Sequence, residues 1–171
     1  MNGRAVALAV MTVGVALIVF TMTAKPMPRL LWNASASVPI GLYRLEPIHK
    51  LAVTNLVVAA APEPLATVFA ERDYLPLGVP LIKRILALPG QSVCRNGLLI
   101  TVDGKLVGAA LVHDSRHRGL PVWQGCRRIA HDEVFLMNTD APASLDGRYF
   151  GPTPLTAIVG RALPLWTLAR Q

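Results

Sequence analysis

The sequence predicts a mainly β domain of short antiparallel strands that follows one N-terminal apolar helix. Residues 5–24 carry no charge and are largely apolar, and a run of about 20 apolar residues is what a helix needs to cross a bilayer core. From residue 40 onward, short apolar runs alternate with turn residues, a pattern typical of short strands. The 171 residues are enough for one domain and such a helix.

Segment 1–24 is expected to be either a retained membrane anchor or a signal segment. Basic residues lie on both sides of its apolar run 5–24, Arg4 before and Lys25 and Arg29 after, so the positive-inside rule does not set the orientation. Met22-Thr23-Ala24 fits the small-residue cleavage pattern only in part, because Met22 is not small. Both alternatives export the rest of the chain.

Residues 25–34 are expected to form a connector, because Pro26 and Pro28 discourage helix. Residues 35–171 then form the exported domain. Asn96-Gly97 and Asp103-Gly104 lie on either side of one apolar run, and each pair is a strong hairpin signal. The helix expected in this domain covers residues 62–72. The expected strands are residues 41–45, 55–59, 98–102, 107–111 and 133–137.

The formal net charge is +7, which admits either a nucleic-acid partner or an anionic membrane surface. The basic residues are mostly scattered and form no aromatic-basic stripe, so we expect no nucleic-acid partner. The chain has two cysteines, Cys94 and Cys126. An even number in an exported domain favours a disulfide, and the alternative is two buried free thiols.

A serine nucleophile needs an adjacent base, and three kinds of base are present. His113-Asp114-Ser115 contains all three triad residue types, but triad members converge from separate segments, so we interpret it as a solvated loop. Asp140 and Asp146 share one polar segment, but carboxylates activate serine poorly. No residue set has convincing metal-ligand spacing, and we expect no metal or organic cofactor.

Lysine is the remaining base. Lys25, Lys50 and Lys105 lie beside the apolar segment or in polar turns, whereas Lys83 lies between the apolar runs 79–82 and 85–88. Apolar surroundings penalise the ammonium form and lower the lysine pKa. A neutral Lys83 amine could accept the proton of a serine, and the alternative is a surface lysine with a packed stem.

Three separated blocks resemble the signal peptidase I superfamily of Ser/Lys peptidases. They are Ser37-Val38-Pro39-Ile40-Gly41-Leu42-Tyr43, Lys83-Arg84-Ile85-Leu86-Ala87-Leu88-Pro89-Gly90, and Ser144-Leu145-Asp146-Gly147-Arg148-Tyr149-Phe150-Gly151-Pro152. The chain is most similar to the TraF branch of conjugative-transfer peptidases. The features shared with that branch are the Ser-x-Pro-x-Gly-Leu-Tyr form, Asn33, the cysteine pair and Gly125-Cys126-Arg127-Arg128.

The resemblance implies a signal-peptidase-like β domain with Ser37 as nucleophile and Lys83 as general base. It implies that the Ser35 hydroxyl assists an oxyanion hole made with the Ser37 amide. Asp146 resembles the supporting acid of the family, paired with Arg84 or Arg148, and a purely structural ion pair is the alternative.

The resemblance further implies a membrane-associated serine endopeptidase that matures a pilin precursor by C-terminal cleavage and head-to-tail cyclisation. The implied partners are that membrane-inserted pilin, the inner membrane and the conjugative transfer (type IV secretion) apparatus. The catalytic domain is then periplasmic, whether anchored or released by signal cleavage. Two alternatives remain: a general signal peptidase I that releases exported proteins, and a non-catalytic scaffold subunit of a secretion or transfer apparatus.

Overall fold

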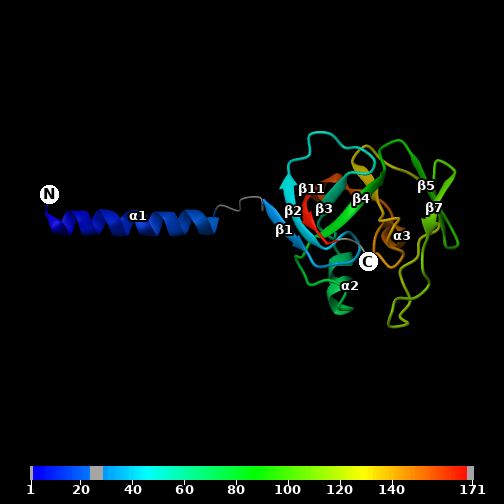
Figure 1. Cartoon of the computed structure of the whole chain (residues 1–171), viewed down its shortest axis with the longest axis horizontal. Coiled ribbons are helices and arrows are strands. Elements are labelled where there is room, and N and C mark those ends of the chain that lie inside the picture. Colours follow the sequence, from blue (N-terminus) through cyan, green and yellow to red (C-terminus); the bar gives the residue numbers. More distant parts are fainter. Residues whose placement is uncertain (1, 24–28, 169–171) are drawn as a thin grey trace.

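The computed structural model describes residues 2–23 and 29–168. Its long N-terminal helix stands apart from a β domain made of two antiparallel sheets (Figure 1). The helices are α1 Gly3–Thr23, α2 Leu65–Glu71 and α3 Gly147–Phe150. The strands are β1 Leu30–Asn33, β2 Gly41–Glu46, β3 Leu56–Ala59, β4 Leu81–Ala87, β5 Ser92–Asn96, β6 Leu99–Val102, β7 Lys105–Ala109, β8 Gly125–Arg128, β9 Glu133–Leu136, β10 Thr153–Pro154 and β11 Ile158–Thr167. The expected mainly β architecture is confirmed.

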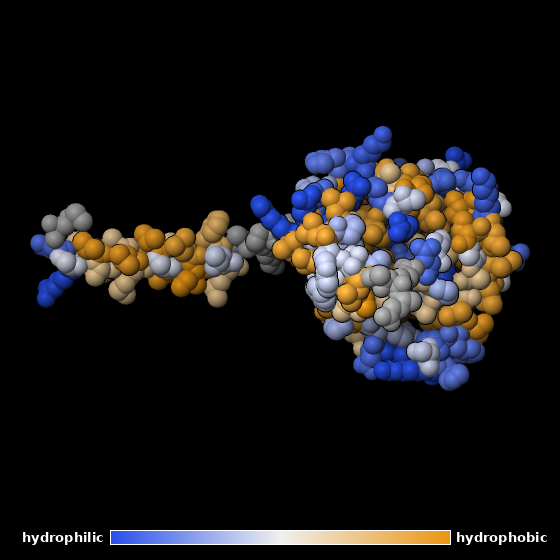
Figure 2. All heavy atoms as spheres, viewed as in Figure 1, coloured by the Kyte–Doolittle hydropathy of each residue, from blue (hydrophilic) through white to orange (hydrophobic). Residues whose placement is uncertain are grey.

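α1 is long and apolar enough to cross a membrane, with a mean hydropathy of 2.5 over Gly3–Met22. Apolar side chains cover it along its length in Figure 2. This is compatible with either a membrane anchor or a signal segment, since both are long apolar helices. The residues around the expected helix end, 24–28, lie outside the described part of the chain.

The larger sheet has seven strands in the order β1-β2-β11-β3-β4-β9-β10. β11 is an interior strand that pairs with β2 on one side and β3 on the other. At one edge β1 pairs with β2, from Leu30 opposite Arg44 to Asn33 opposite Gly41. Within the expected connector over 25–34, Leu30–Asn33 form this edge strand, because β2 offers them hydrogen-bond partners that local sequence does not reveal.

The smaller sheet has four strands in the order β7-β6-β5-β8. Both predicted hairpins are present. Gly97-Leu98 connects β5 to β6, and Asn96 ends β5 opposite Leu99. Asp103-Gly104 connects β6 to β7 with both turn residues at positive φ, 47° and 77°. The disulfide is also confirmed. Cys94 on β5 lies directly opposite Cys126 on β8, and the two are bonded with Cα atoms 4.0 Å apart.

Two apolar clusters hold the site region in place. One joins the two sheets and centres on Phe135 of β9 and Met137, both fully buried. The other lies among the first strands of the larger sheet and includes Val38, Tyr43 and Ile82. Val38 and Ile82 are direct neighbours of Ser37 and Lys83 in the chain. Their burial therefore fixes the backbone from which both functional side chains project.

Candidate active site

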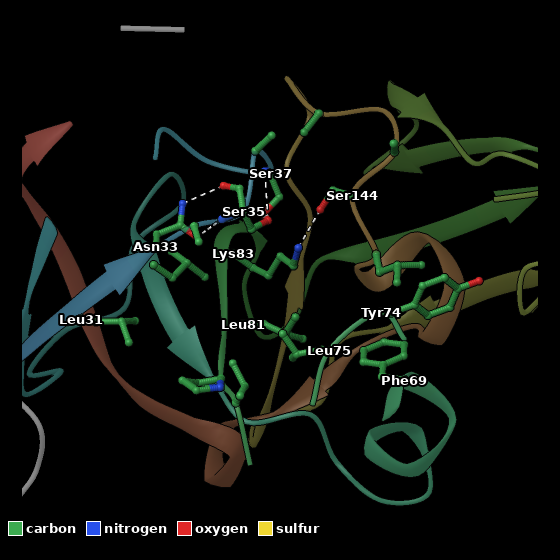
Figure 3. A pocket seen from close by; sticks show the side chains of 18 of the residues that line it. Leu31, Asn33, Ser35, Ser37, Phe69, Tyr74, Leu75, Leu81, Lys83 and Ser144 are labelled. Atoms are coloured by element: carbon green, nitrogen blue, oxygen red, sulfur yellow. Dashed lines mark hydrogen bonds between the residues drawn. The ribbon is translucent and has the colours of Figure 1, made fainter. Parts of the chain in front are cut away.

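A cleft of about 790 Å³ opens on the larger sheet. β1 and the turn after it form one wall, and Phe69, Tyr74 and Leu75 form the other. The floor comes from β4, including Leu81 and Lys83, and the segment 140–145 closes one end. The cleft therefore gathers Ser35, Ser37, Lys83 and Ser144 from separate parts of the chain (Figure 3).

The turn that carries Ser37 is shaped by Asn33, the last residue of β1. The Asn33 side-chain amide donates to the carbonyls of Ser35, Val38 and Pro39, at 2.8, 3.2 and 3.1 Å. Its Oδ1 accepts from the Ser35 backbone N–H at 3.1 Å. One buried side chain thus satisfies backbone groups on both sides of Ser37, which explains why the turn needs an amide at this position.

Gly41 ends the same turn because no larger residue fits there. It has φ of 154°, and a Cβ on it would collide with the backbone carbonyl of Trp166 on β11. Tyr43 follows with its hydroxyl donating to the Pro39 carbonyl at 2.6 Å. The Pro, Gly and Tyr of the first sequence block therefore all serve to hold one backbone shape around Ser37.

Ser37 is half-buried and its hydrogen-bond partner is Ser35. The Ser35 hydroxyl donates to Ser37 Oγ at 3.1 Å and accepts from the Ser37 backbone N–H at 3.3 Å. Both potential oxyanion donors, the Ser35 hydroxyl and the Ser37 amide, consequently lie on the same side of the turn. In this arrangement the two groups bond each other, and of the two only the Ser35 hydroxyl can rotate toward a substrate carbonyl.

Lys83 lies in the middle of β4 and is only 3% exposed. Burial lowers the pKa of its amine from 10.5 to about 8, while the nearby Asp146 carboxylate raises it and the Arg148 guanidinium lowers it. At that pKa roughly a tenth of the amine is neutral at pH 7, far more than for an ordinary lysine. A neutral amine can accept a proton from a hydroxyl.

Ser144 is a site residue that sequence reasoning did not assign a role. Its hydroxyl accepts from Lys83 Nζ at 2.7 Å and is itself buried. In the view of Figure 3 the Lys83 amine points toward the side of the cleft where Ser37 and Ser144 lie. Ser144 belongs to the third sequence block, two residues before Asp146, but only the fold shows that its hydroxyl contacts Lys83.

Asp146 and Arg148 form a buried ion pair behind the lysine. Arg148 Nε and Nη2 donate to the two Asp146 oxygens, each at 2.9 Å, and the two side chains are 0% and 2% exposed. Asp146 also caps α3 by accepting from the Arg148 backbone N–H at 3.2 Å. Of the two expected partners of Asp146, the structure has Arg148.

Arg84, the other expected partner, has its guanidinium directed away from Asp146, and this group donates to the exposed Thr54 carbonyl at 2.8 Å. Its backbone N–H instead donates to the side chain of Asn138 at 2.9 Å, and the Asn138 amide donates to the Ile82 carbonyl at 3.3 Å. Asn138 thus hydrogen-bonds to the β4 backbone on both sides of Lys83. Sequence reasoning missed this residue, because nothing local distinguishes it from an ordinary turn asparagine.

The segment 113–115 does not form a triad. His113 and Ser115 are exposed, whereas the Asp114 side chain is only 8% exposed and accepts from Tyr74 and Arg118. The expectation of a loop is therefore right, and the expectation that it is fully solvated is wrong for Asp114. The loop does not line the cleft.

Comparison with known proteins identifies the class. The family model "Signal peptidase, peptidase S26" matches residues 3–166, so the chain belongs to the signal peptidase family, peptidase S26. Membership of this peptidase family supports a serine peptidase.

Several similar proteins are conjugal transfer proteins. The conjugal transfer protein TraF of Agrobacterium fabrum (strain C58) is 32% identical over 144 residues, covering 79% of this chain and 81% of that protein. A probable conjugal transfer protein TraF of Sinorhizobium fredii is 35% identical over 147 residues, covering 80% and 77%. The expected resemblance to the TraF branch is confirmed.

A probable signal peptidase I-1 of Synechocystis is 30% identical over 115 residues, covering 67% of this chain and 54% of that protein. Among solved structures, a signal peptidase I from Enterococcus faecalis V583 matches with a TM-score of 0.41 and 17% identity, covering 67% of this chain and 97% of that one.

Proposed function

We propose that the protein is a membrane-associated serine endopeptidase of conjugative transfer that matures a pilin precursor. Ser37 is the nucleophile, Lys83 the general base and the Ser35 hydroxyl an oxyanion donor. The observation that carries the proposal is the buried Lys83, whose pKa of about 8 leaves a neutral amine in the same cleft as a serine. The similarity to TraF proteins supports a role in conjugative transfer.

The reaction would be acyl transfer at the pilin C-terminus. Ser37 Oγ attacks the scissile carbonyl as Lys83 Nζ takes its proton, and Lys83 then returns a proton to the departing amine of the tail. The acyl-enzyme is released by water, which gives a linear pilin, or by the pilin's own amino terminus, which gives a ring. Cyclisation restores the Ser37 hydroxyl and closes a peptide bond with no water consumed.

Asp146 and Arg148 would act as positioning groups behind Lys83, with Ser144 aligning the amine. No proton needs to pass through the buried ion pair. The substrate would be presented from the inner membrane to a periplasmic domain, within the transfer apparatus. The disulfide agrees with that location, because disulfides persist in oxidising compartments.

The deciding experiment is intact-mass measurement of the cognate pilin in cells with wild-type protein or with Ser37→Ala. We expect pilin from wild-type cells to be lighter by its tail and by one further water, and pilin from Ser37→Ala cells to keep its tail. Loss of the tail without loss of that water would leave an endopeptidase that does not cyclise. The same mature mass in both strains would refute the assignment of pilin maturation to Ser37.

The similarity to a probable signal peptidase I-1 favours a second candidate, a general signal peptidase that releases exported proteins. Rescue of cells depleted of their housekeeping signal peptidase would support this candidate, with Ser37→Ala as the inactive control. Lys83→Met addresses the third alternative, a scaffold, since a scaffold would assemble pili normally without the lysine amine.

A further inference from the structure

The wall of the cleft opposite β1 comes from α2 and the turn after it. Phe69, Tyr74 and Leu75 lie on this side, across from Leu31 (Figure 3). Phe69 is 2% exposed and packs edge-to-face against Tyr74, with ring centroids 6.1 Å apart. We call Phe69, Tyr74 and Leu75 the α2 wall. Because this wall is apolar, its position decides how wide an apolar side chain the cleft can take.

α2 belongs to neither sheet, so strand pairing does not hold the α2 wall in place. Its polar attachment is to the loop 112–120, where Tyr74 Oη donates to Asp114 Oδ2 at 2.6 Å. Arg72 adds a hydrogen bond to the Gly119 carbonyl at 2.7 Å. The wall is thus tied to a loop about 40 residues away in sequence, which itself lies outside the cleft.

Asp114 is built as a fixed anchor point. Its Oδ1 accepts from the backbone N–H groups of Arg116 and Arg118 at 2.9 and 2.8 Å, and its Oδ2 also accepts from Arg118 Nε at 2.7 Å. The Arg118 guanidinium lies 4.8 Å from the centre of the Tyr74 ring. Burial raises the pKa of Asp114, but the hydrogen bonds from Tyr74 and Arg118 outweigh it and hold the pKa well below its usual range.

We propose that Asp114 is a positioning residue that sets the α2 wall through Tyr74, and so determines which substrate side chains the cleft accepts. The inference rests on the proposed peptidase function. It gives the loop 112–120 a role in substrate selection although no residue of the loop touches the cleft. The carboxylate holds Tyr74 and the loop backbone at once, so its loss removes the bond between them and loosens the wall, while the Arg72 bond to Gly119 and the packing of Phe69 against Phe150 remain.

Two variants test the proposal in the full chain in detergent. Tyr74→Phe removes the hydroxyl and keeps the ring, and Asp114→Asn keeps the side-chain shape. The probe is a set of quenched peptides spanning the cognate pilin cleavage junction, with Ala, Leu or Phe at each flanking position. We expect either variant to raise KM for the native peptide about fivefold with kcat nearly unchanged, and to reduce discrimination against Leu and Phe.

The matched control is Arg116→Gln. It removes an exposed ion pair to Asp73 between the same two segments, with side chains 60% and 74% exposed. Exposed pairs contribute little, so KM and selectivity should stay at wild-type values. A purely structural role of Asp114 would lower thermal stability without changing the KM-to-kcat balance or the side-chain preference.

A second measurement reports the local stability of the α2 wall in the absence of substrate. Amide hydrogen exchange over residues 65–79 should be about tenfold faster in Tyr74→Phe than in wild type, while exchange in β6 stays unchanged. Unchanged exchange together with unchanged KM and selectivity would overturn the proposal. If instead the Ser37→Ala protein cleaves the peptides as well as wild type, the proposed function fails, and the exchange result still decides whether Asp114 holds the wall.

Discussion

Lys83 is the residue whose chemistry depends most on its surroundings. In water its amine would be almost entirely charged at neutral pH, but in the cleft burial brings its pKa to about 8. The favourable charge of Asp146 is partly offset by Arg148, which is paired with it. The site thus keeps a carboxylate near the lysine without restoring the lysine to its ordinary pKa.

This pKa predicts the pH dependence of the proposed activity. The neutral amine is the active form, so the rate should rise with pH and level off above the folded pKa of about 8. Between pH 7 and 9 the neutral fraction rises about tenfold, and kcat/KM for a quenched junction peptide should rise in parallel. A flat profile, after subtraction of the Lys83→Met background, would contradict a lysine base.

Ser144 predicts a separate effect on turnover. Its hydroxyl holds Lys83 Nζ at 2.7 Å, so Ser144→Ala should let the amine move and lower kcat about tenfold, with KM little changed. Steady-state kinetics on the same peptide measure this. Ser115→Ala, at an exposed loop serine, is the control, and equal kcat in both variants would show that Ser144 does not align the amine.

At the level of elements, one site depends on pieces of several strands and turns. β4 presents Lys83, the turn after β1 presents Ser37, and the segment before α3 presents Ser144. Gly147 lets α3 sit close to β9, because a Cβ there would lie 2.6 Å from the Phe135 ring. Small residues at such crossings bring these elements within reach of one another.

The disulfide between β5 and β8 predicts a stability effect without an effect on chemistry. The bonded cysteines are 32 residues apart in sequence, and closing such a loop contributes about 3–4 kcal/mol in the chain-entropy model. The double variant Cys94→Ser/Cys126→Ser should lose about that much unfolding free energy in urea titration. Since neither cysteine lines the cleft, kcat/KM at 25 °C should stay near wild type; a large loss would tie the smaller sheet to catalysis.

At the scale of the whole molecule, α1 and the β domain have different environments. α1 exposes apolar side chains along its length, which water does not favour and a bilayer does. The β domain has its own buried clusters in both sheets. The chain is therefore suited to a membrane segment that carries a folded aqueous domain.

The proposed location predicts the behaviour of a fusion protein. Alkaline phosphatase, which is active only after export, should be active when fused after residue 171, and inactive when residues 2–24 are deleted. The mass of the fusion in the membrane fraction distinguishes a retained anchor from a cleaved signal. An inactive fusion of the full chain, made in normal amounts, would contradict the periplasmic assignment.

The sequence by itself determined the features that follow from local rules. The uncharged apolar run predicts α1, Asn-Gly and Asp-Gly predict the two hairpins, and the even number of cysteines predicts the disulfide, because each depends on neighbours or on residue type. Lys83 could be selected as a candidate base from its apolar neighbours, and Ser37 was selected because its block resembles that of the signal peptidase I superfamily. The apolar residues around Lys83 indicated its burial, and burial is what lowers its pKa.

Only the tertiary structure decided which distant groups meet. Three such contacts join residues that are 40 or more positions apart in sequence. They are the hydrogen bonds from Lys83 to Ser144, from Asn138 to β4 and from Tyr74 to Asp114. The edge strand β1 was missed for the same reason, since its partner β2 supplies the hydrogen bonds. Such contacts form when burial of the core brings separate elements together, and no local sequence pattern records them.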